Sequence, residues 1–350
     1  MPDHERMMRA LEIESDEISG TLPWDNPNSN PLEDIRRALK AMHDSHYMNR
    51  TVTSIETISL TEESELSDSV AIVSGGLDSI TLVYHMISEG YKPHLLSFDY
   101  GQRHKKELGF ARITANALGL QHNIIDLTGI THLISNSALT SGEIHVLAED
   151  PNTSAKQTGE HHSIEVPDGH YAEETMKATV VPNRNMMMLS IAAAVAVNNK
   201  YRCIATGVHS GDHFIYPDCR PEFIEGMNNI IPIANADFHN FDGFQDPTTS
   251  DISSGAIWAP FLSVSKADIA FRALELGVPL HLTWSCYKGG ENHCGKCGTC
   301  VERLEAIAEA QMRWAKSGKM MPQTVIDDTV YDDTKFWKVA TREKSNAGEV

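Results

Sequence analysis

The sequence lacks several features that define common classes of protein. No run of about 18 or more apolar residues occurs, so no segment is predicted to span a membrane. No apolar stretch follows the charged N-terminal residues, so no secretory signal is predicted and a cytoplasmic protein is expected. Basic residues are scarce, 29 against 48 acidic ones, and the net charge of −19 excludes a general basic surface for direct nucleic-acid binding. These absences favour a protein that acts on small molecules.

Cysteines are also few, but four of the six lie close together. Cys286, Cys294, Cys297 and Cys300 have the spacing C-x7-C-x2-C-x2-C, with glycines that let the backbone fold around an ion. The pattern predicts one structural Zn²⁺ bound by four thiolates, with no open position for water. An iron–sulfur cluster would use the same four ligands, whereas a reducing cytosol disfavours a disulfide.

No Gly-Lys-Ser or Gly-Lys-Thr occurs, which excludes a Walker A loop, but another phosphate-binding pattern is present. The apolar run 70–73 predicts a buried strand that stops at Ser-Gly-Gly and continues as a helix from Asp78. Two glycines and a helix N-terminus direct N–H groups at an anion, and Ser74 and Ser79 add hydroxyls. Asp78 would repel phosphate unless Mg²⁺ lies between them. The alternative is an ordinary strand-to-helix turn with a good cap.

Strands and helices are expected to alternate along the chain. The predicted strands are 70–73, 94–98, 123–127, 203–207 and 258–261. The predicted helices are 78–88, 105–118, 186–197, 223–229, 263–276 and 301–314, with Asn183 or Asn185 and Ser263 or Ser265 as caps of the third and fifth. Right-handed crossovers between parallel strands then give an α/β fold, a doubly wound sheet with helices on both faces.

The remaining boundaries follow from composition. Residues 1–65 are expected to be an acidic, partly ordered N-terminal extension, and 66–280 the α/β domain, with a long polar surface loop inserted at about 128–174. A small zinc-binding lobe and its following helix occupy 281–315, and 316–350 form a mobile C-terminal tail.

Two further clusters are candidate binding residues. Arg184 lies at the positive end of an apolar helix, where a cation is costly unless it meets an anion; the alternative is an arginine at a surface loop end. Tyr216 can stack on a flat ring, whose edges Asp218, Arg220 and Glu222 would contact. The alternative for this cluster is a loop with a helix cap.

Five segments occur in an order that resembles one known family. They are Ser-Gly-Gly-Leu-Asp-Ser (74–79), Phe-Asp-Tyr-Gly-Gln-Arg-His (98–104), Val-Pro-Asn-Arg-Asn (181–185), Tyr-Pro-Asp-Cys-Arg-Pro-Glu-Phe (216–223) and the cysteine segment 285–303. Together they resemble QueC, the 7-cyano-7-deazaguanine synthases of queuosine biosynthesis in the PP-loop ATP pyrophosphatase superfamily. The resemblance covers about residues 70–310.

This resemblance implies an adenine nucleotide alpha hydrolase-like fold and an ATP-dependent ligase. Its substrates would be 7-carboxy-7-deazaguanine, ammonia and ATP with Mg²⁺, and its product the nitrile preQ0. A homodimer is expected by analogy. The resemblance implies that Ser74, Gly75, Gly76, Asp78 and Ser79 hold the pyrophosphate of ATP, and that zinc is held by Cys286, Cys294, Cys297 and Cys300. From the residues themselves we expect Val73, Leu77, Asp99, Tyr100 and Arg103 to join the ATP-binding set, and Arg184 to act on the phosphates, so that the catalytic residues are Ser74, Asp78, Ser79 and Arg184. We likewise expect the deazaguanine to contact Tyr216, Asp218, Arg220 and Glu222.

Other functions stay open on the sequence alone. A QueC-like enzyme could adenylate a different carboxylate or a macromolecular target. A tRNA thiolase or an amide-forming synthetase shares the phosphate loop, but the acidic charge and the lack of a glutaminase region argue against both. A non-enzymatic zinc module would leave the phosphate loop unexplained. The sequence identifies no general base.

Overall fold

The structure is a computed structural model that describes residues 67–134, 137–140, 165–241, 244–245, 252–253, 255–317 and 327–338. The chain divides into two units, Met1–Glu62 and Glu63–Val350, and every described residue belongs to the second. The predicted N-terminal extension therefore lies outside the described residues.

A sheet of five parallel strands forms the centre of the second unit. Its strands are β1 (Ser69–Ile72), β2 (Pro93–Asp99), β3 (His122–Asp126), β4 (Ile204–Ala205) and β7 (Ile257–Trp258), in the order β3-β2-β1-β4-β7. The order reverses between β1 and β4, and ligands bind at such a switch point, beyond the carboxyl ends of the strands. The predicted doubly wound sheet is confirmed. A separate antiparallel pair consists of β5 (Phe244–Gln245) and β6 (Ile252–Ser253).

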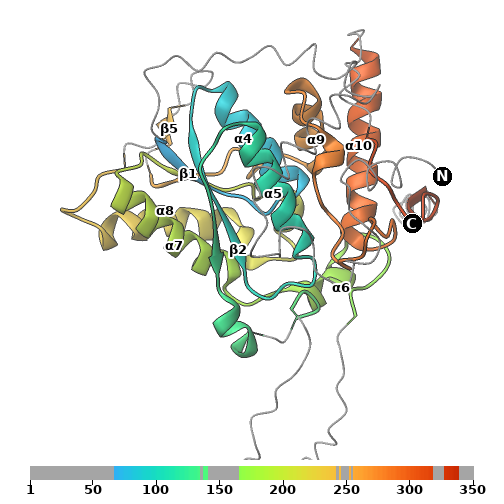
Figure 1. The fold of residues 1–350 in the computed structure, drawn as a ribbon, viewed down its shortest axis with the longest axis horizontal. Helices are drawn as coiled ribbons and strands as arrows, with labels where there is room; N and C mark the ends of the chain where they lie inside the picture. The colour runs from blue at the N-terminus through green and yellow to red at the C-terminus, as the bar shows by residue number, and fades with distance from the viewer. Residues whose placement is uncertain are drawn as a thin grey trace, which may run out of the picture. The chain divides into compact units, whose positions relative to one another are not determined.

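Helices cover both faces of this sheet (Figure 1). One face packs against α4 (Leu77–Ser88), α5 (Lys106–Ala117), α9 (Lys266–Glu275) and α10 (Gly298–Lys316), the other against α7 (Arg184–Asn199) and α8 (Pro221–Ala234). Because strand side chains alternate between faces, Ala71 joins the α4 side whereas its neighbour Val70 joins the α7 side. Short turns complete the unit: η3 (Thr128–Leu133), α6 (Glu173–Met176), η4 (Lys177–Thr179), η5 (Ser210–Asp212), η6 (Pro217–Cys219) and η7 (Leu280–Leu282).

The segment Lys177–Asn199, which includes α7, is long and apolar enough to cross a membrane by length and composition alone. In the fold, Leu189, Ala192 and Ala196 of this helix are buried against the sheet. The same composition is therefore explained by a core helix.

The caps of two helices can be compared with their predictions. Ser265 caps α9 in a capping box with Asp268, as one of the two predicted alternatives. Asn183, one of the two predicted alternatives, occupies the N-cap position of α7, but the cap bond comes from elsewhere. Asn183 precedes this helix with φ 56° and makes no side-chain cap bond, and the N–H of Asn185 donates instead to Asp218 Oδ2 at 2.9 Å. A residue distant in sequence thus supplies the cap.

Two expectations about irregular segments need correction. The polar stretch after residue 128 was predicted as a surface loop, yet Leu139 and Thr140 are fully buried, and Leu139 accepts a hydrogen bond from the N–H of Arg103 at 2.8 Å. Residues 141–164 of that stretch lie outside the described residues. A tail after residue 316 was predicted to be mobile, but its described part, 327–338, is held in place.

We call residues 327–338 the C-terminal strap. The fully buried guanidinium of Arg303 donates to Tyr331 Oη at 2.9 Å and to Asp327 Oδ1 at 3.2 Å. The N–H of His293 also donates to the carbonyl of Val330 at 3.2 Å. The strap therefore ties the end of the chain to α10 and to the cysteine segment.

Candidate active site

The loop between β1 and α4 directs its backbone N–H groups at two serine hydroxyls. Those of Ser74 and Gly75 donate to Ser79 Oγ at 3.2 Å, and that of Gly76 donates to Ser74 Oγ at 3.2 Å. α4 begins at Leu77, so its positive end points into the same loop. Converging N–H donors at a helix N-terminus can bind an anion, and the geometry fits a phosphate cradle.

Gly75 is a position in this loop that leaves no room for a side chain. Its φ is +99°, and an added Cβ would lie 2.0 Å from the carbonyl oxygen of Glu107. Its own carbonyl accepts a hydrogen bond from the N–H of Trp284 at 2.9 Å. The first turn of α5 and the segment before the cysteines therefore both pack directly against the loop.

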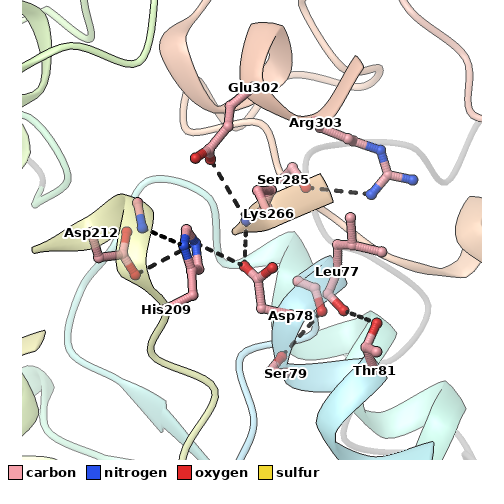
Figure 2. Close-up of polar contacts among 12 residues, drawn as sticks. Leu77, Asp78, Ser79, Thr81, His209, Asp212, Lys266, Ser285, Glu302 and Arg303 are labelled. Atoms are coloured by element: carbon pink, nitrogen blue, oxygen red, sulfur yellow. Dashed lines mark hydrogen bonds and ion pairs between the residues drawn. The ribbon is translucent and has the colours of Figure 1, made fainter. Parts of the chain in front are cut away.

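Five ionisable side chains from four segments gather at the start of α4 (Figure 2). Lys266 Nζ forms an ion pair with Asp78 Oδ2 and lies 3.6 Å from Glu302 Oε2. His209 Nε2 lies 3.9 Å from Asp78 Oδ2 and 3.6 Å from Asp212 Oδ2. One lysine thus stands between carboxylates of α4 and α10, beside the phosphate loop.

Burial and charge oppose each other in this network. Burial favours the neutral form of Asp78, but the charges of Lys266 and His209 outweigh it and lower the pKa of this carboxyl. Burial disfavours charged Lys266 as well, yet Asp78 and Glu302 raise its pKa above the ordinary value. For Glu302 burial dominates, and its pKa is raised. The Asp78–Lys266 pair is therefore charged, and Glu302 is protonated more readily than Asp78.

One oxygen of this network fits a cation. Asp78 Oδ1 is buried and has no hydrogen-bond partner in the part of the chain that the structure describes. Mg²⁺ binds carboxylate oxygens together with phosphate oxygens. Because Asp78 immediately follows the loop, its free oxygen is suited to a Mg²⁺ ion that accompanies a bound nucleotide.

A second cluster surrounds Arg184 at the start of α7. Its guanidinium carbon lies 5.6 Å from the centre of the Tyr216 ring, a cation–π distance, and Tyr100 and Tyr287 lie close to the same charge. Tyr171 donates to Asp212 Oδ1 at 2.7 Å and so connects this cluster to the Lys266 network. Among the described residues no carboxylate pairs with Arg184, which leaves its charge available for an anion.

The four residues predicted to contact the deazaguanine have different surroundings. Tyr216 is buried beside Arg184, and its hydroxyl is hydrogen-bonded to Thr179 Oγ1 at 2.7 Å. Asp218 caps α7 as described above. Arg220 is exposed and donates from Nε to a backbone carbonyl at 2.7 Å, and Glu222 is exposed on the first turn of α8. The structure brings Tyr216 to the site and gives Asp218 a structural contact.

Asp99, Tyr100 and Arg103, predicted to bind ATP, follow β2. Asp99 pairs with Lys105 at 3.0 Å, and Tyr100 is buried next to Arg184. The N–H of Arg103 donates to Leu139. Their position at the carboxyl end of the sheet agrees with the switch-point rule.

Sequence reasoning missed Lys266, His209, Asp212 and Glu302. Lys266 lies within the predicted helix 263–276 and Glu302 within the cysteine segment 285–303, and the sequence motifs assign neither of them a role. A signal was available, because Lys266 begins the helix after β7 and His209 follows β4, so both come from the carboxyl edge of the sheet. The sequence does not show that these side chains come together around Asp78 in the folded protein.

The four clustered cysteines are placed to bind a metal ion. The sulfurs of Cys286, Cys294, Cys297 and Cys300 all lie within 4.8 Å of one another, and those of Cys294 and Cys300 are 3.9 Å apart. Four thiolates around one Zn²⁺ at about 2.3 Å require sulfur separations of about 3.8 Å. The arrangement therefore fits a single tetrahedral ion.

The environment favours the thiolate at Cys294 and Cys297 but the thiol at the other two cysteines, because hydrogen bonds among the four sulfurs raise the pKa of Cys286 and of Cys300. Hydrogen bonding from Cys286 lowers the pKa of Cys294 to about 6 and holds that of Cys297 well below its ordinary value. The N–H of Cys297 donates to Cys294 Sγ at 3.2 Å. Thiolates are the form that binds metal, so binding of an ion would release protons from Cys286 and Cys300.

Comparison with known proteins gives a consistent result. Residues 68–311 match the family model described as queuosine biosynthesis protein QueC. A 7-cyano-7-deazaguanine synthase from Brucella anthropi is 46% identical over 278 residues, which cover 79% of this chain and 99% of that protein. One from Rhizobium meliloti is 46% identical over 272 residues, which cover 78% of this chain and 95% of that protein.

Among solved structures, the U34-tRNA thiolase NcsA from Methanococcus maripaludis with its 4Fe-4S cluster aligns with 82% of this chain and 76% of its own. The sequence identity is 13% and the TM-score 0.30. A likeness at this level carries no argument about metal or substrate.

Proposed function

This chain belongs to the queuosine biosynthesis protein QueC family, and we propose that it is a 7-cyano-7-deazaguanine synthase, a ligase that uses ATP to convert 7-carboxy-7-deazaguanine and ammonia to the nitrile. One observation carries the proposal: relatives with this name are 44–46% identical to the chain over 94–99% of their own length. The phosphate loop and the free Asp78 oxygen support the proposal, because this chemistry needs a site for pyrophosphate and for Mg²⁺.

The reaction requires oxygen to be removed from carbon twice. A carboxylate is a poor electrophile, so a first ATP adenylates it and releases pyrophosphate. Ammonia then displaces AMP and gives the amide. A second ATP adenylates the amide oxygen, and departure of AMP leaves the nitrile. Both rounds release pyrophosphate, so a single phosphate loop can serve both.

In this proposal the loop residues bind the leaving pyrophosphate. The N–H groups of Ser74, Gly75 and Gly76 turn from the serine hydroxyls to phosphate oxygens, and preorganised donors of this kind stabilise charge that develops as the bond breaks. Mg²⁺ would be held by Asp78 Oδ1 and would neutralise phosphate charge. Lys266 keeps Asp78 ionised for this purpose.

Arg184 is proposed to bind the phosphates, because its cationic side chain is half-buried and no carboxylate within the described part of the chain pairs with it. The Tyr216 ring, which lies next to that guanidinium, would contact the deazaguanine. Asp218, Arg220 and Glu222 stay proposals; the exposed side chains of Arg220 and Glu222 would have to turn toward the substrate. Ser79 completes the proposed catalytic set with Ser74, Asp78 and Arg184.

Zinc is the proposed metal of the four-thiol group. The sulfur separations fit one tetrahedral ion, whereas an iron–sulfur cluster would hold its ligands apart by the width of the cluster. With all four positions filled by protein, the ion would be structural. The further expectations, a cytoplasmic homodimer that does not bind nucleic acid directly, rest on composition and on family analogy.

The test is product analysis by mass spectrometry with purified protein, 7-carboxy-7-deazaguanine, ammonium and MgATP. We expect the nitrile with two AMP for each nitrile formed, lost in Ser74→Ala and Asp78→Ala. Ser88→Ala, at the exposed far end of the same helix, is the matched control and should behave as wild type. AMP without consumption of the deazaguanine would refute the substrate and point to another carboxylate or to a macromolecular target.

A further inference from the structure

A buried histidine lies next to the phosphate loop with one ring nitrogen unused. His104, immediately before α5, is 2% exposed, and its Nε2 lies 3.3 Å from Glu107 Oε1. Its Nδ1 is buried and has no hydrogen-bond partner among the described residues. A buried polar atom without a partner costs free energy, so its presence points to a use.

The carboxylate beside His104 is itself held in place. Gln102 Nε2 donates to Glu107 Oε1 at 3.3 Å and to the carbonyl of Phe98 at 2.9 Å, and Gln102 Oε1 accepts from the N–H of Tyr100 at 2.9 Å. Gln102 and Glu107 are 1% and 7% exposed. Backbone groups at the end of β2 therefore hold the Gln102 side chain in place. Gln102 in turn positions the Glu107 carboxylate beside His104.

This arrangement determines which nitrogen of His104 can accept a proton. Nε2 lies 3.3 Å from a carboxylate oxygen, which cannot supply a hydrogen, so a hydrogen on Nε2 is favoured there. Nδ1 then has the free lone pair. A base whose other nitrogen is held by an oriented carboxylate is the arrangement found in catalytic triads, where the carboxylate also stabilises the imidazolium that forms.

His104 lies beside the candidate site. The backbone of Glu107 packs against Gly75 of the phosphate loop. The His104 ring lies 5.0 Å from that of Tyr287, and Tyr287 borders Arg184. His104 is thus connected on one side to the phosphate loop and on the other to the cluster around Arg184.

We propose that His104 Nδ1 is the general base that removes a proton from the substrate nitrogen in both rounds of the reaction. In the first round ammonia adds to the acyl adenylate, Nδ1 takes a proton from the new ammonium nitrogen, and the C–O bond to AMP breaks with its electron pair on the AMP oxygen. In the second, Nδ1 takes the proton of the adenylated imidate, the nitrogen electrons form the C≡N bond, and AMP again leaves. Each proton passes to solvent or AMP before the next round. This inference rests on the proposed function.

The test separates adenylation from the steps that need a base. His104→Gln keeps a donor for Glu107 but removes the base. His94→Gln is the matched control, since His94 is 5% exposed and hydrogen-bonded on both ring nitrogens, away from the site. ATP–pyrophosphate exchange with the carboxylate measures the first adenylation, and rapid quench with mass spectrometry measures acyl adenylate, amide and nitrile.

For His104→Gln we expect exchange within about twofold of wild type and nitrile formation reduced at least about 100-fold, the contribution of a general base. The acyl adenylate should accumulate, and conversion of added amide to nitrile should be slowed as well. Glu107→Gln should show the same pattern with a smaller loss, and it carries the test if His104→Gln does not fold. His94→Gln should form nitrile at the wild-type rate per folded molecule.

Three results would overturn the assignment. Nitrile formation at the wild-type rate in His104→Gln, or in Glu107→Gln where the first variant does not fold, would exclude the base role. Loss of exchange in proportion to nitrile formation would show a structural role instead. Wild-type protein that makes no nitrile would refute the proposed function, and the assignment would fall with it.

Discussion

Replacing Lys266 by methionine should destabilise the fold because it leaves carboxylates buried without their partner. At 3.6 Å and an effective dielectric constant of 20, the attraction between Lys266 Nζ and Glu302 Oε2 is about 5 kcal/mol, and Asp78 is nearer still. Desolvation offsets much of this when the pair is intact, but removal of one partner of a buried pair typically costs about 3–5 kcal/mol. We expect Lys266→Met to lower the free energy of unfolding by about 3 kcal/mol, measured by urea denaturation at pH 7.

A second substitution tests the cause of this loss. Lys266→Met combined with Glu302→Gln should recover part of it, because the double variant buries one charge fewer. Arg313→Met is the control, since Arg313 pairs with Asp268 at 2.8 Å but both side chains are about 40% exposed, and such pairs contribute about 1 kcal/mol at most. A loss below 1 kcal/mol for Lys266→Met, or no recovery in the double variant, would contradict the electrostatic reasoning.

Three further predictions concern the pH dependence of stability, the backbone of the phosphate loop and the binding of zinc. Burial lowers the pKa of His122 from 6.5 to about 4, so this histidine is neutral in the folded protein at pH 7. As pH falls, the unfolded chain binds a proton at this histidine before the folded protein does. The free energy of unfolding should therefore drop by about 3 kcal/mol between pH 7 and pH 4. Urea curves for His122→Gln should lack that portion of the decline, and an unchanged pH dependence would contradict the assignment. Gly75→Ala should reduce ATP-dependent turnover at least about 100-fold because its Cβ meets Glu107, whereas Gly119→Ala, with φ +64° and open space, should cost only about 1 kcal/mol of stability and no activity; equal effects would show that strain alone is responsible. Cys297→Ser should reduce bound zinc, measured by elemental analysis, from one ion per chain to less than a tenth, and full retention of metal would rule out the four-thiolate site.

The parts of the fold that the sequence predicted are those determined by local pattern. The apolar run before Ser74 and the helical spacing after Asp78 depend on neighbours a few residues away, and both elements occur as predicted. The cysteine spacing similarly limits how the four sulfurs can meet.

The features that could not be predicted depend on contacts between residues that are far apart in the sequence. Asp78 and Lys266 are 188 positions apart, and no periodicity reports that they meet. Asp218 suited both a ligand contact and a helix cap, and only the position of α7 shows which contact it makes. His104 stood in a motif that the sequence analysis quoted, but an unused nitrogen becomes visible only when every neighbour of the ring is known.

The first two turns of α10 restrict how this protein can change in length. Cys300 in these turns reaches the other thiols, Glu302 reaches Lys266, and Arg303 reaches the C-terminal strap. Inserting or deleting one residue between Cys300 and Arg303 would rotate the later side chains by about 100° and separate them from their partners together. Length variation among natural or designed versions of this chain should therefore be absent from Cys300 to Arg303.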